Sequence, residues 1–367
     1  MNIKIKREAL LKPLSSVSSI VERRHTLPIL SNLLLEIKKN KLCLTATDLE
    51  MQISQSIESL QNSEFSTTIS AKKLLDICRA LPENTDLDIA ITDNRMTLKA
   101  GKSRFNLQTL PSADYPVMTK AVGTSSTVIK LPQNELKRLL KQVEFAMAQQ
   151  DIRYYLNGLL LEVNGNSLNI VGTDGHRLSF TTTILSASYE KQDVILPRKT
   201  VIELIKSLNE SEEEITIELS TSQVNFCFDE THLISKVIDG KFPDYNRVIP
   251  NGHQNSFSVN RLEVLQAMQR ASILSNEKYR GIRMVFGNNN LKLVSTNTEQ
   301  EEAEEELDID YNKSIMDIGF NVTYLIDVLN NIQNDRVNFA FADANSSCLV
   351  TIPNNQDYKY VVMPMRI

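Results

Sequence analysis

The fold is decided by a central stretch of the chain, NGLLLEV at residues 157–163 followed by LNIVGTD at residues 168–174. Apolar residues dominate both runs, and the residues between them are Asn, Gly, Asn and Ser. A polar turn between two apolar runs predicts a β-hairpin. Apolar residues three or four apart precede the hairpin at residues 136–147 and follow it at residues 197–205. This spacing predicts two amphipathic helices that flank the hairpin.

The same order of elements occurs three times along the chain. NLLLEI with LCLTATD at residues 32–48, and GIRMVF with LKLVSTN at residues 281–297, predict two further hairpins. A helix precedes and another follows each of them. From Thr47 to Thr173 is 126 residues, and from Thr173 to Thr296 is 123. We therefore expect an α+β protein of three similar domains, each with two helices and two antiparallel sheets, spanning residues 1–125, 126–253 and 254–367.

The composition is that of a globular protein with a large core, because 41% of the 367 residues are hydrophobic and 23% are charged. No run approaches the roughly 18 apolar residues of a membrane span. Residues 1–6 alternate like a strand and do not resemble a signal peptide. These features predict a cytoplasmic protein. Four scattered cysteines form no metal motif, and we expect them to be small buried side chains. They are Cys43, Cys78, Cys227 and Cys348.

The charge is unevenly distributed along the chain. Six predicted helical segments together carry +10, which leaves −15 for the rest of a chain whose net charge is −5. A repeated array of basic helices can follow DNA phosphates without reading bases. The alternative, that these charges only solvate the outer faces of the helices, stays open. The segments are residues 6–24, 72–79, 135–153, 198–206, 261–283 and 320–333.

The sequence contains no motif for catalysis or for base-specific readout. It has no G-x-S-x-G nucleophile elbow, phosphate loop, helix-turn-helix, zinc finger or RNA-recognition motif. His176 lies two residues from Asp174, but without a nucleophile this pair predicts a structural or pocket-lining histidine. Asp48, at the equivalent position of the first repeat, is expected to accept hydrogen bonds in a turn or cap. We therefore expect a non-enzymatic protein without a metal or cofactor.

Seven different motifs follow one another along the chain in an order and spacing typical of one family. They are TLPILSN at 26–32, TDLE at 47–50, QDIRYYLNG at 150–158, TDGHRL at 173–178, FPDY at 242–245, ILSNEK at 273–278 and YVVMPMR at 360–366. With these motifs the full chain resembles the beta subunit of bacterial DNA polymerase III, the sliding clamp. The resemblance implies a head-to-tail homodimer that closes into a ring around duplex DNA, with helices lining the hole. It also implies a clamp loader, polymerases and other replication or repair proteins as partners.

The resemblance implies a pocket for partner peptides near the end of the chain. Aliphatic walls, adaptable methionines and a few polar groups suit a short apolar peptide. By pattern alone, residues 361–365 also fit a last core strand, and Pro364 favours a strand end or edge there. The implied pocket residues are Tyr155, Leu156, Thr173, Gly175, His176, Arg177, Leu178, Pro243, Val248, Asn321, Tyr324, Ser347, Val361, Val362, Met363, Pro364, Met365 and Arg366.

The resemblance also implies residues that contact DNA. Tyr154 among them suits stacking on an exposed base, and the alternative is a half-buried aromatic side chain between domains. The implied DNA contacts are Arg24, Gln150, Tyr154, Arg198 and Lys199.

A dimer interface is implied where the acidic run at residues 299–306 faces the basic end of the first domain. The opposite charges favour head-to-tail pairing. Lys102 departs from the arginine of the best-known relatives, and a lysine cannot form a bidentate pair. The implied interface residues are Lys73, Lys102, Arg104, Phe105, Leu107, Ile273, Leu274, Glu299, Glu301, Glu302 and Glu304.

Two alternatives come from other classes of protein. A DNA-dependent nuclease or hydrolase requires a cluster of metal ligands or a nucleophile, and the sequence shows neither. A scaffold unrelated to DNA leaves the separation of charge between helices and sheets without an explanation. Enclosure of DNA requires only weak attraction to phosphates, because tight contacts would slow sliding.

Overall fold

The computed structural model divides the chain into two compact units. The first unit contains residues 1–136 and 202–237, and the second contains residues 137–201 and 238–367. The predicted middle third of the chain, residues 126–253, therefore contributes to both units. Its predicted boundaries fall at or beside segments outside the described residues and stay predictions. The structure describes residues 2–21, 27–58, 64–92, 94–119, 127–250 and 253–366.

The described part of the first unit forms one antiparallel sheet of twelve strands, in the order β1-β6-β7-β8-β5-β2-β3-β4-β14-β13-β12-β9. Pairing of β4 with β14 joins strands of the first and second predicted domains. The strands are β1 (Asn2–Lys6), β2 (Asn32–Lys38), β3 (Lys41–Thr47), β4 (Met51–Glu58), β5 (Phe65–Ser70), β6 (Asp86–Thr92), β7 (Arg95–Ala100), β8 (Ser103–Leu110), β9 (Thr127–Pro132), β12 (Glu214–Leu219), β13 (Gln223–Phe228) and β14 (Thr231–Lys236).

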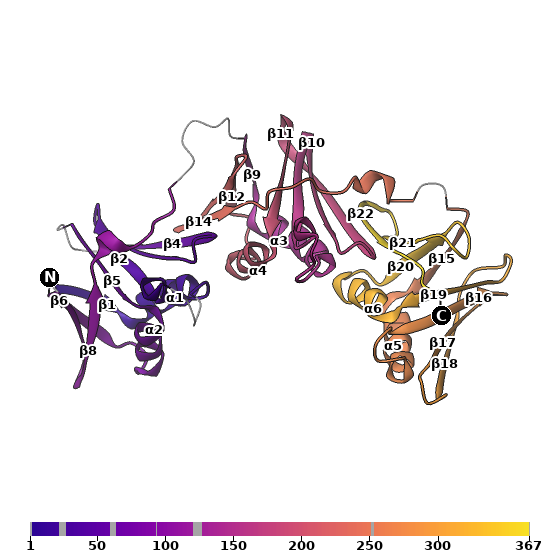
Figure 1. Ribbon diagram of the computed structural model, residues 1–367, viewed down its shortest axis with the longest axis horizontal. Helices are drawn as coiled ribbons and strands as arrows, with labels where there is room; N and C mark the ends of the chain where they lie inside the picture. The colour runs from indigo at the N-terminus through magenta and orange to yellow at the C-terminus, as the bar shows by residue number, and fades with distance from the viewer. Residues whose placement is uncertain are drawn as a thin grey trace. The chain divides into compact units, whose positions relative to one another are not determined.

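Two helices of the first unit, α1 (Arg7–Ser18) and α2 (Ala71–Ala80), pack against each other, and α1 also packs on β3 and β4 (Figure 1). The predicted apolar stripe of α1 is buried, since Leu10, Leu14 and Val17 are at most 1% exposed. Burial of this stripe is what stabilises such a short helix, because helices of this length are marginal alone.

The described part of the second unit contains two antiparallel sheets. One has the order β10-β11-β22-β21-β20-β15, and the other has the order β18-β17-β16-β19. The strands are β10 (Gly158–Thr173), β11 (Arg177–Pro197), β15 (Asn255–Asn260), β16 (Gly281–Gly287), β17 (Asn290–Thr296), β18 (Glu302–Asp308), β19 (Met316–Asn321), β20 (Arg336–Phe341), β21 (Cys348–Ile352) and β22 (Asn355–Val362).

Helices α5 (Arg261–Ala271) and α6 (Val322–Asn331) lie side by side in the second unit (Figure 1). An aromatic cluster fills the core of this unit. The ring of Phe257 lies 5.2 Å from that of Phe286 and 5.5 Å from that of Phe339, measured between centroids. Rings at these separations add to the stabilisation that comes from their burial.

All three predicted hairpins are present. β2 pairs with β3, and β16 pairs with β17. The central hairpin lies within β10, where Gly165 has a φ of +60°. The side-chain amide of Asn169 donates to the carboxylate of Glu162 at 3.1 Å, although the two residues are seven positions apart in the sequence. A straight strand would separate them by about 23 Å, so the chain reverses between them.

Three predicted helices end earlier than expected. In the described residues, segment 6–24 is helical only over α1, segment 135–153 only over α3 (Gln133–Val143), and segment 261–283 only over α5. After α3 and α5 the chain tightens into 3₁₀ turns, which prolongs the apolar spacing beyond the helix. The fourth predicted segment is α4 (Arg198–Ser207). The 3₁₀ turns are η1 (Pro28–Ser31), η2 (Ser112–Asp114), η3 (Glu144–Ala146), η4 (Tyr154–Leu156), η5 (Tyr245–Arg247) and η6 (Ser272–Leu274).

The structure retains the predicted separation of charge between the helices and the rest of the chain, but the net charge of the helices is smaller than predicted. Helices α2, α3 and α4 each carry +2, α1 and α5 each carry +1, and α6 carries −1. The six helices therefore carry +7, which leaves −12 for the rest of a chain of net charge −5. The predicted value was too high partly because Lys278, Arg280 and Arg283 lie beyond the end of α5.

Candidate partner-binding site

A cavity of about 280 Å³ lies in the second unit. It contains all nine residues predicted for the pocket between positions 155 and 248, together with two of the predicted residues near the end of the chain. Its lining residues are Arg153, Tyr155, Leu156, Thr173, Gly175, His176, Arg177, Leu178, Phe242, Pro243, Tyr245, Val248, Val361 and Met363.

The base of the cavity is apolar and closely packed, whereas its mouth is open. Leu156, Leu178 and Val361 are buried and at most 2% exposed. At the mouth, Val248 is 44% exposed and Met363 is 49% exposed. A partner that seats an apolar side chain here would cover both of these exposed groups, which is a favourable change of about 25 cal/mol for each Å² of apolar surface removed from water.

The turn between β10 and β11 forms one wall. The hydroxyl of Thr173 donates to the carbonyl of Arg177 at 2.6 Å and accepts from the amide of Gly175 at 3.1 Å. The carboxylate of Asp174 accepts from the amides of His176 and Arg177, at 2.9 and 3.1 Å. A Thr-Asp pair of this kind satisfies the backbone of a tight turn, which fixes the residues that face the cavity.

Gly175 is required by both its backbone and its surroundings. Its φ is +88°, a conformation that costs other residues free energy. A Cβ at this position would lie 2.8 Å from the Nη1 atom of Arg153. The glycine therefore allows the Arg153 side chain to lie over the turn.

The same turn occurs in the first repeat, where it confirms the predicted role of Asp48. The Asp48 carboxylate accepts from the amides of Glu50 and Met51, at 2.9 and 2.7 Å. In the third repeat, Asn297 accepts from the amides of Glu299 and Glu301. The threefold repetition of the sequence thus extends to the hydrogen bonds of the turns.

The last residues of the chain are tied to the wall of the cavity. The amide of Met363 donates to the carbonyl of His176 at 2.9 Å, and Val362 pairs with Arg177 across β22 and β11. The interpretation as a last core strand holds for part of this segment, and its role in a partner pocket stays a prediction. Val361 and Val362 are buried strand residues, as a last core strand would have, while Val361 and Met363 also line the cavity.

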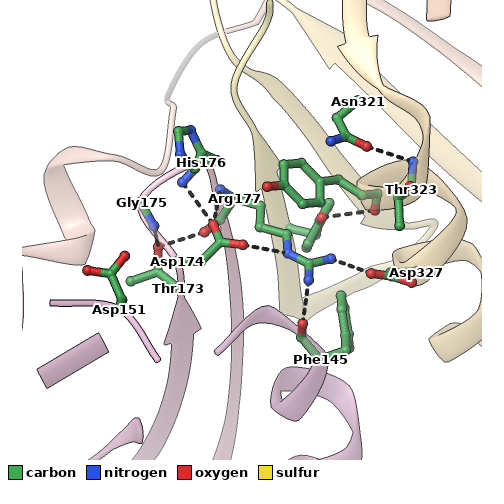
Figure 2. Close-up of polar contacts among 12 residues, drawn as sticks. Phe145, Asp151, Thr173, Asp174, Gly175, His176, Arg177, Asn321, Thr323 and Asp327 are labelled. Carbon is green, nitrogen blue, oxygen red and sulfur yellow. Dashed lines mark hydrogen bonds and ion pairs between the residues drawn. The ribbon is translucent and has the colours of Figure 1, made fainter. Parts of the chain in front are cut away.

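The side chain of Arg177 is held by several hydrogen bonds and by an aromatic ring (Figure 2). Its guanidinium donates to the carboxylates of Asp174 and Asp327, at 3.1 and 2.6 Å, and to the carbonyl of Phe145 at 2.6 Å. The ring of Tyr324 lies beneath it, 4.5 Å from the central carbon. These contacts hold a side chain that is only 10% exposed, and a buried guanidinium requires such partners.

Arg153, the other arginine of the cavity, is also paired. Its guanidinium forms two hydrogen bonds with the carboxylate of Asp151, at 3.0 and 2.8 Å, and a third with the carbonyl of Asp174. The hydrogen bonds from Arg153 lower the pKa of Asp151 to about 2. The carboxylate is therefore ionised at neutral pH, and each arginine of the cavity has an acidic partner.

Sequence reasoning missed three lining residues: Arg153, Phe242 and Tyr245. All three lie within the quoted motifs QDIRYYLNG and FPDY, so a signal was present. The hydroxyl of Tyr245 donates to the carboxylate of Glu162 at 2.7 Å, and its ring stacks on Phe180 at 5.7 Å. Tyr245 thereby anchors the wall that contains Phe242.

Seven predicted pocket residues lie outside the lining of this cavity. Asn321 caps α6, where its side chain accepts from the amide of Thr323 at 2.9 Å. Tyr324 supports Arg177 from below. The three residues that follow Met363 line a separate, more polar hollow of about 850 Å³ with Arg283 and Asp317. The seven are Asn321, Tyr324, Ser347, Val362, Pro364, Met365 and Arg366.

His176 and Asp174 do not have the geometry of a catalytic dyad. Their hydrogen bond uses the backbone amide of His176, and the imidazole points away from the carboxylate (Figure 2). Within the described ranges, no group of three or more His, Cys, Asp or Glu side chains is placed to hold a metal ion. Cys78 and Cys348 are buried as expected, while Cys43 and Cys227 are half-buried.

Four of the five predicted DNA contacts lie in the second unit, and Arg24 lies outside the described residues. Tyr154 is 59% exposed, which is more than its half-buried alternative requires. The amide of Arg198 at the start of α4 donates to the carbonyl of Asn157, next to η4, at 3.1 Å. Gln150 is exposed and Lys199 is partly buried.

The predicted interface residues of the first unit lie on α2, on β8 and in the turn before β8. Lys73, Lys102 and Arg104 are exposed, and Phe105 and Leu107 are half-buried. Residues 103–108 of β8 pair with β7, and only the end of β8 pairs with β5 in the described sheet.

In the second unit, the predicted interface residues lie at η6 and at or before β18. Within the described sheets, β18 is an edge strand and pairs with β17 alone. Ile273 is 76% exposed and Leu274 is half-buried. The glutamates predicted here are exposed, and one of them, Glu304, is ion-paired with Lys292 on β17. They are Glu299, Glu301, Glu302 and Glu304.

In the part of the chain that the structure describes, no helix is long and apolar enough to cross a membrane.

Comparison with known proteins places the whole chain in one family. Three family models match it in order: DNA polymerase III beta subunit, N-terminal domain over residues 1–119, central domain over 130–244 and C-terminal domain over 246–366. The beta sliding clamp of Pseudomonas aeruginosa is 47% identical over 373 residues, and that of Escherichia coli K12 is 42% identical over 368 residues. Each alignment covers 100% of both proteins.

Solved structures agree with the sequence matches. A crystal structure of DNA polymerase III subunit beta from Pseudomonas aeruginosa has a TM-score of 0.96 and 46% identity, and covers 100% of both chains. A sliding clamp from the same organism, solved bound to griselimycin, matches with the same TM-score, identity and coverage. From these matches over its full length, the chain belongs to the DNA polymerase III beta subunit family, the beta sliding clamps.

Proposed function

We propose that two copies of this chain form a ring around duplex DNA, which slides along it and tethers polymerases through the cavity of the second unit. The observation that carries this function is the membership of the full chain in the beta sliding clamp family. No reaction is assigned to the chain, because a tether acts by enclosure. Its place of action would be the cytoplasm, where a bacterial chromosome is replicated, and a clamp loader would open the ring.

The cavity supports the tethering role. An apolar base, an open mouth with a flexible methionine and arginines whose charges are paired suit an apolar peptide segment. We propose that the fourteen lining residues bind the clamp-binding peptides of polymerases and of other replication or repair proteins. The seven predicted residues outside the lining would extend or support this site.

Two open strand edges support the proposed head-to-tail dimer. β8 of the first unit and β18 of the second unit each have an edge without a partner strand over much of their length in the described sheets. Pairing of β8 in one copy with β18 in another would continue the sheet across the interface. Lys102 and Arg104 beside β18 glutamates would select this arrangement over a head-to-head one.

Basic helices support DNA binding without sequence readout. Five of the six helices in the described residues carry a net positive charge, although the chain as a whole is acidic. Attraction of this kind is screened by salt and does not distinguish bases. We propose that Arg24, Gln150, Tyr154, Arg198 and Lys199 contribute to it.

We also propose the domain boundaries predicted from the repeats, at residues 1–125, 126–253 and 254–367. The three family matches, at residues 1–119, 130–244 and 246–366, support this division. In each domain the hairpin carries the Thr-Asp or Thr-Asn turn.

Enclosure is tested by loading the protein onto closed circular DNA with a clamp loader and ATP. Retention is then measured by gel filtration before and after the circle is cut once. Enclosure predicts that the protein stays on the circle and leaves the cut molecule from its ends. Equal release from both forms, or equal retention on both, would contradict it.

A matched variant controls for simple affinity. Ile273→Asp places a charge in the proposed interface, on a side chain that is 76% exposed in the single chain. The variant should fold, remain monomeric and fail to stay on circular DNA. The DNA is recovered at the end, since new breaks in it would instead support the nuclease alternative.

A further inference from the structure

The cavity contains a charged residue whose partners come from three different elements. Arg177 lies at the start of β11, and its acceptors are Asp174 in the preceding turn, Phe145 in η3 and Asp327 on α6 (Figure 2). Each of its three side-chain nitrogens donates to one of these acceptors. Asp327 is 150 positions away in the sequence and does not line the cavity.

We propose that Asp327 is a positioning and specificity-determining residue for the cavity: it holds the Arg177 guanidinium in place and cancels its charge, so that the site selects neutral over acidic side chains at the one peptide position that meets Arg177. This inference rests on the proposed function of the cavity as a peptide site. It concerns a residue that acts on the partner only through Arg177.

The geometry makes Asp327 the partner that fixes the far end of the side chain. Asp174 reaches the Nε atom, close to the backbone of Arg177, whereas Asp327 accepts from the terminal Nη1 at 2.6 Å. The Tyr324 ring, which lies one helical turn before Asp327 on α6, packs under the guanidinium. Loss of Asp327 would remove a charged acceptor from a largely buried donor, which is costly.

The charges around the cavity lead to the specificity. Arg177 lies between two carboxylates, Asp174 and Asp327, and Arg153 is paired with Asp151. Two arginines thus face three aspartates, so neither guanidinium is available as a net positive charge for a partner. A carboxylate brought into this site would meet repulsion, and it would lose its own hydration on entry.

The α6 end of this network is itself anchored. The Asn321 side chain caps the start of α6, and the hydroxyl of Tyr360 on β22 donates to the carbonyl of Tyr324 at 2.9 Å. The carboxylate of Asp327 is therefore presented from a helix fixed at two points. A rigid support of this kind is what a positioning residue requires.

The test uses the full-length protein and a fluorescently labelled peptide from the C-terminus of a polymerase of the same cell. A set of variant peptides has each position replaced in turn by Asp. Fluorescence anisotropy gives the affinity of each peptide for the wild type and for Asp327→Asn, Asp327→Ala and Asp327→Glu. Asp335→Asn, an exposed position beyond α6, is the matched control for the loss of one charge.

Asp327→Asn keeps an acceptor but removes the charge. The penalty for Asp should then fall by roughly tenfold at the peptide position that meets Arg177, and stay unchanged elsewhere. Asp327→Ala removes the acceptor as well and should weaken the parent peptide by roughly tenfold or more. Asp327→Glu should restore the wild-type preference, and Asp335→Asn should leave it unaltered.

A second background shows whether the effect passes through Arg177. In Arg177→Met, the further change Asp327→Asn should no longer alter the penalty for Asp at that peptide position. Thermal unfolding of every variant shows that it is folded. Three results would overturn this inference and leave the proposed function intact. In Asp327→Asn, the penalties for Asp could be unchanged at every peptide position, or all peptides could lose affinity equally. The effect of Asp327→Asn could also persist in the Arg177→Met background. Failure of the wild type to bind any peptide would overturn the proposed function, and this inference with it.

Discussion

The first and second repeats contain the same turn, yet only the second one borders the proposed site. At the first turn, the hydroxyl of Tyr115 accepts from the amide of Thr47 at 3.2 Å and donates to the carbonyl of Asn32. At the second, another tyrosine that follows an aspartate in the chain, Tyr245, donates instead to Glu162 at 2.7 Å. Tyr115 thus covers the first turn, whereas Tyr245 leaves the second turn uncovered and forms part of a cavity wall.

The two turns also differ in the residue that follows the aspartate. The first turn has Leu49 at a φ of +76°, and the second has Gly175 at +88°. A leucine at positive φ carries strain, of about 1–3 kcal/mol, that the surrounding packing must offset. A glycine in the second turn avoids this strain and leaves room for Arg153. The turn is therefore a structural device, and a site arises where neighbouring side chains leave it uncovered.

The largest expected effect comes from removing the C-terminal segment, which is hydrogen-bonded to the second turn. Deletion of residues 363–367 removes Met363 and its hydrogen bond to His176. We expect peptide binding to weaken by more than about 30-fold, as for loss of a hot spot. The dimer should remain intact, because its proposed edges lie elsewhere. Fluorescence anisotropy and sedimentation measure the two properties, and unchanged peptide affinity would contradict the site.

A smaller effect should follow when the two turns exchange character. Gly175→Ala introduces strain of about 1 kcal/mol and displaces Arg153, so peptide affinity should fall by roughly tenfold. Leu49→Gly should relieve strain at the first turn and leave peptide affinity unchanged. Chemical denaturation and peptide titration of both variants provide the readout. An equal loss of affinity in the two would mean that the turns do not differ in function.

The smallest effect concerns the two tyrosines. Tyr245→Phe removes a hydrogen bond to Glu162 and should lower stability by about 1–2 kcal/mol and peptide affinity by roughly threefold. Tyr115→Phe should lower stability to a similar extent without altering peptide affinity. If Tyr115→Phe weakens the peptide as much as Tyr245→Phe does, the contrast between the two walls is wrong.

The carboxylate below the second wall also predicts a pH dependence. Burial raises the pKa of Glu162, but hydrogen bonds from Tyr245, Asn169 and Lys191 outweigh it and leave this pKa below its ordinary value. A lowered folded-state pKa stabilises the protein above the ordinary carboxyl range, and the contribution is lost as the pH falls through that range, near about 4.3, and then through the folded-state pKa. Glu162→Gln should reduce this loss in acid denaturation.

Local patterns predicted most of the fold. Alternating runs around polar turns gave the hairpins, and the apolar spacing of Leu10, Leu14 and Val17 gave α1. The ends of α3 and α5 were predicted too late, because the 3₁₀ turns η3 and η6 keep apolar side chains near helical spacing. Periodicity alone does not distinguish a helix from its tightened last turn.

The site depended on a different kind of signal. Motifs located the lining residues around Thr173 and Pro243, because those residues are contiguous in the sequence. The partner of Arg177 could not be found in this way, since Asp327 lies on a helix of the third repeat. Long-range charge pairing of this kind is set by how the elements pack, and a single sequence does not record it.

The contrast between the two turns is tested most directly by hydrogen exchange of the full-length protein, with and without a polymerase C-terminal peptide. Binding at the cavity predicts slower exchange of the amides of residues 173–178 and of Met363 when the peptide is present. The amides of residues 47–52 should exchange at the same rate in both samples. Protection at the first turn, or equal protection at both, would contradict the assignment of the partner site to the second turn.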